Sequence, residues 1–154
     1  MRRLFARLLQ RPRVSGQAQA PRGAAAHTAT AHAQPRIEVG STLHTMAELD
    51  PVAAAAFADA FAVEIEQSIA TCALGDAATP QAKALEQIHA LKNTISLTGS
   101  QPLLKACDQL RGDVGRHVPG DTLAHRFTAI ATAAGLLVRH YRRMLPPDDT
   151  SPHV

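Results

Sequence analysis

Five polar residues between Glu86 and Ser96 share one side of a predicted helix. His89 lies three residues after Glu86, and Lys92, Asn93 and Ser96 follow it at three, four and seven residues, spacings that align side chains on one helical face. An exposed imidazole is mostly neutral at pH 7, so a ring nitrogen can attack an electrophile. Lys92, one turn away, can stabilise an anion bound to that nitrogen.

The spacing by itself leaves an ordinary surface histidine as the favoured alternative, because the chain contains eight histidines. The apolar residues of the same segment fall on the opposite side of the helix, so we expect His89 to be exposed to solvent. This apolar face comprises Ala84, Leu85, Ile88, Leu91 and Ile95.

The composition and spacing of the sequence after residue 36 predict helices throughout. Much of the apolar content is alanine, aromatic residues make up 3% of the chain, and there is no tryptophan. This composition favours helix, and short links between amphipathic helices are typical of antiparallel packing. We therefore predict an all-α fold, with an antiparallel four-helix bundle over residues 37–146, a short extra N-terminal helix and no convincing strand.

Capping residues and prolines predict where the helices begin. Glycines and prolines predict where they end. The predicted starts are Ser41 or Thr42, Asp50 with Pro51, Thr79 with Pro80, Ser100, and Asp121; the predicted ends are Leu49, Leu74, Gly99, Leu110 before a turn-rich link from Gly112 to Gly120, and Pro146.

Residues 1–36 form an Arg-rich arm with seven arginines and no acidic residue, a charge of +7, whereas residues 37–154 carry −4. Most of the arm lacks apolar periodicity, so we predict disorder, and likewise a flexible end over 147–154. The high isoelectric point belongs to the arm, so no nucleic-acid binding is expected of the helical part. Residues 1–10 could instead form a basic amphipathic helix, and weak contact of residues 1–13 with an anionic membrane stays open beside a solvated arm.

We expect a cytoplasmic monomer. The apolar segment near the N-terminus is too short for a secretory signal and is interrupted by Arg7, and no stretch is long enough to span a membrane.

Cys72 and Cys107 are predicted to be buried thiols, since their spacing gives no evidence of a disulfide or a metal site. No pair of His or Glu residues on neighbouring turns faces the core, so no metal and no cofactor are expected.

The pattern around His89 resembles the histidine-containing phosphotransfer (HPt) domains of multistep two-component phosphorelays. The family pattern has a histidine, two residues, a lysine and then a glycine, with a second glycine ten residues after the histidine. An aligned leucine, cysteine and leucine follow on the next helix. Here His89, Lys92 and Gly99 fall in register, and so do Leu103, Cys107 and Leu110. The resemblance extends over about residues 43–145.

The resemblance implies a four-helix bundle that carries a phosphoryl group on His89 between aspartates of receiver domains. Lys92 would stabilise the group, and Glu86, Asn93, Ser96 and Gly99 would contact the receiver. Mg²⁺ is expected on the receiver, and the chain contains no ATP-binding pattern, which implies a carrier and not a kinase.

Two residues depart from the family pattern: Asn93 replaces the glycine usual after the lysine, and Arg111 replaces a common acidic residue. Asn93 adds bulk where a receiver would approach, which leaves transfer rate or partner choice open. The alternatives are a docking module that binds receivers without relaying, and a membrane or nucleic-acid adaptor led by the arm.

Overall fold

The computed structural model describes residues 34–147, and within this range the chain forms five helices and no strand. The prediction of an all-α fold is confirmed. The predicted arm, with the amphipathic helix considered as an alternative for residues 1–10, lies outside the described residues, apart from residues 34–36, which have no regular structure. The predicted flexible end also lies outside them beyond residue 147. The helices are α2 (Thr42–Leu49), α3 (Pro51–Ala70), α4 (Gln81–Ser96), α5 (Gln101–Gly115) and α6 (Gly120–Met144).

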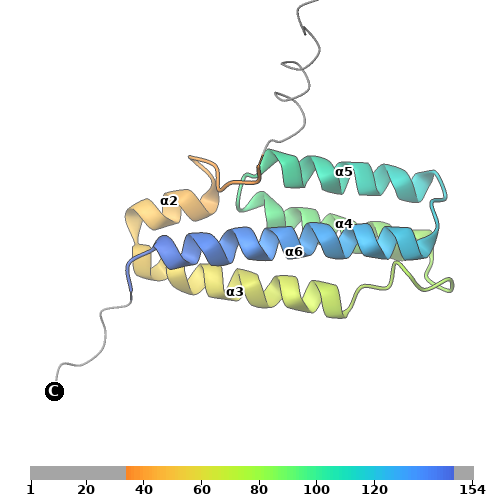
Figure 1. Cartoon of the computed structure of the whole chain (residues 1–154), viewed down its shortest axis with the longest axis horizontal. Helices are drawn as coiled ribbons and strands as arrows, with labels where there is room; N and C mark the ends of the chain where they lie inside the picture. The colour runs from red at the N-terminus through yellow and green to blue at the C-terminus, as the bar shows by residue number, and fades with distance from the viewer. Residues whose placement is uncertain (1–33, 148–154) are drawn as a thin grey trace, which may run out of the picture. The chain divides into compact units, whose positions relative to one another are not determined.

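The four longer helices pack against one another around a shared apolar core, and the short α2 packs on α3 (Figure 1). The most extensive contacts are those between α3 and α6 and between α4 and α5. This packing is compatible with the predicted arrangement. No helix within residues 34–147 is both long and apolar enough to cross a membrane.

Each helix turns its small and branched apolar side chains inward, as the spacing predicts. On α4 the buried residues recur at three and four positions, so the opposite face of this helix meets solvent. The largest fully buried apolar side chains are Phe127, Leu43, Ile88, Leu91, Ile95, Leu110 and Val138. Cys107 is fully buried, Cys72 is partly buried, and both thiols are free.

Two predicted helix starts are confirmed. Ser41 caps α2, accepting a hydrogen bond from the amide of His44. Asp50 caps α3 through a 3.0 Å bond from the amide of Ala53, and Pro51 occupies the first helical position. At that position the missing N–H of proline costs nothing, because it would have no partner within the helix.

The end of α3 was predicted four residues too late, at Leu74. The helix stops at Ala70 because a side chain from α4 binds the backbone that follows. Gln87 donates to the carbonyl of Thr71 at 2.8 Å and accepts from the amide of Ala73 at 2.9 Å. These two bonds satisfy backbone groups that a longer helix would have paired internally.

The link after α5 was also predicted wrongly. Gly112 does not end the helix, which continues to Gly115, and α6 begins at Gly120 and not with Asp121 as its cap. The last turn of α5 is held by Asp113, which binds Arg116 directly after the helix end and Arg126 on α6. At Gly120 a Cβ atom would lie 2.8 Å from the carbonyl of Leu74, so only glycine permits this close approach.

The start of α4 differs by one position from the prediction. Pro80 occupies the cap position, the helix begins at Gln81, and no side chain caps it, so Thr79 does not act as predicted. Ser100 precedes α5 as predicted, but its hydroxyl is buried and accepts no capping bond.

Candidate functional site

His89 lies on the exposed face of α4, as the sequence predicts. The residue immediately before it, Ile88, and Leu91 on the next turn are buried in the core. Anchoring by these apolar side chains fixes which way the helix faces. The imidazole therefore stands on a rigid element with open access from solvent.

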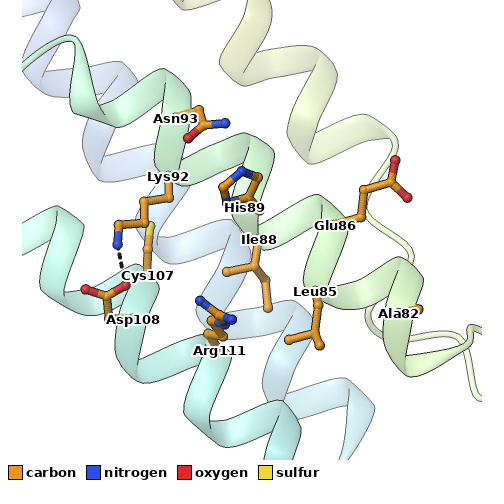
Figure 2. A pocket seen from close by; sticks show the side chains of 10 residues that line it. All are labelled: Ala82, Leu85, Glu86, Ile88, His89, Lys92, Asn93, Cys107, Asp108 and Arg111. Carbon is orange, nitrogen blue, oxygen red and sulfur yellow. Dashed lines mark hydrogen bonds and ion pairs between the residues drawn. The ribbon is translucent and has the colours of Figure 1, made fainter.

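Lys92 is one turn from His89, but its ammonium group is turned toward α5 (Figure 2). Its Nζ lies 2.6 Å from Oδ1 of Asp108. Both side chains are substantially exposed, at 39% for Lys92 and 56% for Asp108. An exposed ion pair of this kind contributes only about 0–1 kcal/mol. Lys92 can therefore exchange Asp108 for another anion at small cost.

A pocket of about 520 Å³ lies beside His89, between α4 and α5. Its α4 wall carries His89, Lys92 and Asn93, and its α5 wall carries Asp108 and Arg111 (Figure 2). Ile88, Leu85 and Cys107 supply apolar surface within it. The pocket thus brings an imidazole, two cationic side chains and the carboxylate of Asp108 to the same surface, and Glu86 lines it as well.

The sequence pattern did not predict that Asp108 and Arg111 line a pocket beside His89. Their positions do contain a hint: they are three residues apart on α5, and each directly follows a buried residue of the Leu103, Cys107 and Leu110 stripe. That placement puts both at the border of the buried face. Which helix they would meet there depends on packing, which periodicity does not specify.

Cys107 is not a competing nucleophile in this pocket. Burial raises the pKa of its thiol to about 11, with a further increase from Asp108 and an opposing effect of Lys92. The reactive form of a cysteine is the thiolate, which is scarce at neutral pH when the pKa is this high. We infer that Cys107 serves as a small apolar core residue.

The other residues predicted to contact a partner are only partly gathered at the pocket. Glu86 lines it, but its carboxylate points away from His89 in Figure 2, and Asn93 lines its α4 wall. Ser96 is exposed and donates its hydroxyl hydrogen to the carbonyl of Asn93.

Gly99 does not line the pocket and lies just beyond the end of α4. Its φ angle is +67°, and a Cβ atom there would lie 2.9 Å from that of Glu38. Both the left-handed backbone and the close approach require glycine. The observed geometry accounts for this residue through the turn between α4 and α5.

A second polar cluster lies further along α5 and is built differently. The side chain of Asp113 is only 12% exposed and binds Arg116 at 2.6 Å and also Arg126. Hydrogen bonding by Arg116, followed by the charge and bonding of Arg126, lowers the pKa of Asp113 despite its burial. No histidine lines the pocket next to this cluster.

Residues 34–147 contain no group of three or more His, Cys, Asp or Glu side chains that could hold a metal ion. No family model, curated protein or solved structure matches this chain. The inference of function therefore rests on the geometry around His89 and on the residue pattern that surrounds it.

Proposed function

We propose that this protein is a phosphorelay intermediate of the HPt type, with His89 as the phosphoryl acceptor. An aspartyl phosphate of one receiver domain supplies the group, and an aspartate of another receiver accepts it. In this proposal α3–α6 form the antiparallel four-helix bundle, α2 is the extra N-terminal helix, and the protein acts as a cytoplasmic monomer.

The chemistry is a balanced exchange of one bond for another. The unprotonated ring nitrogen of His89 forms an N–P bond while the O–P bond of the acyl phosphate breaks. The bonding pair leaves with the aspartate carboxylate, and the other ring nitrogen keeps its proton. The receiver brings Mg²⁺ and much of the electrostatic stabilisation, so this chain needs neither a metal nor a nucleotide site of its own.

One observation carries the proposal: an exposed imidazole on a rigid helix, with an exchangeable lysine one turn away and a pocket beside it. The weak Lys92–Asp108 pair supports a role in which Lys92 turns to the phosphoryl group once it is present. The resemblance of the segment to HPt domains gives the reaction class.

A second candidate is a module that binds receivers without relaying phosphate. Asn93 favours it, because its exposed side chain lies on the pocket wall next to His89, where the family pattern has glycine. The side chain could hinder the close approach that transfer requires, while leaving a looser complex intact.

Labelled receiver domains separate the two candidates. We expect the wild-type protein to take up acid-labile phosphate from at least one member of a panel of phosphorylated receivers, and His89→Gln to take up none. His125→Gln is the matched control, because His125 is also exposed on a helix but lies on α6. Helical content and melting temperature should be close to wild type in both variants.

Labelling of His89→Gln would refute the proposal. If receivers bind the wild-type protein but transfer no phosphate to it, the docking module is the correct alternative.

A further inference from the structure

Arg111 is a cationic side chain of the His89 pocket whose role is open. It lies on the α5 wall of the pocket and is exposed. In the view of Figure 2 its guanidinium group lies between Asp108 and Leu85, below Ile88 and His89. Arg111 and His89 line this pocket from two different helices, α5 and α4.

Arg111 differs from most arginines of residues 34–147 in having no ion-pair partner among them. Five of the seven arginines in this range are paired with carboxylates, and two are not. The paired ones are Arg36, Arg116, Arg126, Arg139 and Arg142; the others are Arg111 and Arg143. Of the two unpaired arginines, only Arg111 lines the pocket of His89.

The two cations of the pocket are therefore in different states. Lys92 is held by Asp108 at 2.6 Å, so part of its charge is already compensated by that carboxylate. Arg111 has no such contact to give up within the described part of the chain. A dianionic group that arrives at His89 meets one cation that is engaged and one that is available.

We propose that Arg111 is a phosphoryl-binding residue, which holds the phosphoryl group on His89 together with Lys92. The guanidinium is planar and always charged, and two of its N–H groups can donate to two oxygens of one phosphoryl group. An ammonium group offers a point charge without this matched geometry. This inference rests on the proposed function of His89 and assigns it a second cation.

The placement also accounts for how the charge of the pocket changes with phosphorylation. Before transfer, Asp108 is paired with Lys92, and Arg111 has no ion-pair partner within residues 34–147. Glu86 also lines the pocket, but its carboxylate points away from His89 (Figure 2). After transfer, the phosphoryl group contributes about two negative charges, which two cations can neutralise. Arg111 thus supplies a countercharge that Lys92 alone would not provide.

Phosphoramidate tests this inference on the full-length chain without any receiver domain, because it donates a phosphoryl group directly to histidine. The half-life of the phosphohistidine is followed after the donor is removed, and mass spectrometry locates the modified residue. The variants are Arg111→Ala and Arg111→Lys, with Lys105→Ala as control. Lys105 is exposed on the same helix but does not line the pocket.

We expect Arg111→Ala to shorten the half-life of phosphohistidine 89 by about three- to tenfold, as for loss of an exposed charge-assisted contact. Arg111→Lys should restore part of it, and Lys105→Ala should leave it unchanged. Rescue by lysine would not occur if Arg111 merely supported folding, and circular dichroism checks the fold of each variant.

Equal half-lives in wild type and Arg111→Ala, or equal losses in Arg111→Ala and Lys105→Ala, would overturn the role of Arg111 while leaving His89 as the acceptor. Absence of phosphate from His89 in the wild type would refute the proposed function, and the role of Arg111 with it.

Discussion

Helix α5 carries two carboxylates only five residues apart, and they form contrasting ion pairs. Asp108 is 56% exposed and holds a single lysine at the edge of the His89 pocket. Asp113 is 12% exposed and holds two arginines, one directly after the end of its own helix and one from α6. The first pair joins α5 to α4 at the surface, and the second joins α5 to α6 in a partly enclosed position.

Solvent access decides what each pair can do. Water competes for both partners of an exposed pair, so the pair is easily exchanged. A carboxylate removed from water needs its partners, because losing them leaves an uncompensated charge. We infer that Asp113 has a structural role at the end of α5, whereas Asp108 has an adjustable one at the site.

The largest expected effect on stability is that of Asp113→Asn. The amide cannot neutralise Arg116 and Arg126, so the last turn of α5 loses its link to α6. We expect a clear drop in melting temperature, with phosphate uptake by His89 retained below that temperature. Asp108→Asn is the matched control and should change the melting temperature little. Equal destabilisation by the two substitutions would contradict the contrast between the pairs.

The pH dependence of stability sharpens the same contrast. The folded-state pKa of Asp113 is lowered, so it lies below the unfolded value of about 3.9. The carboxylate therefore contributes stability above that pH, and the contribution is lost as the pH falls through the folded-state pKa. The difference in melting temperature between wild type and Asp113→Asn should shrink as the pH is lowered below about 4. A constant difference down to the acid limit would argue against ionisation as its cause.

A smaller effect is expected from Lys92→Ala, this time on transfer and not on stability. Removing the ammonium should slow transfer or shorten the phosphohistidine lifetime by about three- to tenfold, since a charge-assisted contact at an exposed site contributes less than the roughly 1.5–3 kcal/mol of a well-formed one. Some activity should remain, because His89 is intact. Transfer rates from a receiver panel measure the effect, and complete inactivity would mean that lysine is required for the chemistry itself.

The smallest expected effect is that of Asn93→Gly. Glycine removes bulk from the α4 wall of the pocket, so a receiver should approach more closely, and transfer with non-cognate receivers should rise. Glycine is the poorer helix former, so the substitution should lower the free energy of unfolding by about 0.5 kcal/mol. Unchanged rates across the panel would show that Asn93 does not restrict approach.

Much of this arrangement was predictable from the sequence, because it depends on local periodicity. The three- and four-residue spacing on α4 correctly predicted that Ile88 and Leu91 are buried and that His89 is exposed. Asp50 followed by Pro51 correctly located the start of α3, since capping involves only neighbouring residues.

The remaining features depend on contacts between helices. Lys92 and Asp108 are 16 residues apart, and Asp113 reaches Arg126 on the next helix, so neither contact follows from the pattern of one helix. The same limitation explains the misplaced end of α5. Gly112 weakens a helix locally, but the ion pairs of Asp113 with Arg116 and Arg126 stabilise the helical turn beyond that glycine.

Gln87 fixes the orientation of α4, and this orientation affects how quickly His89 can react with a partner protein. Its two hydrogen bonds to the segment after α3 tie the helix two residues before His89, which resists rotation of α4 about its own axis. An encounter with a partner then requires little reordering of this helix, so the entropy lost on forming the complex is smaller. A complex whose reacting atoms are already aligned can form loosely and separate soon after transfer. Such a surface suits brief exchange with several partners better than long-lived binding to one.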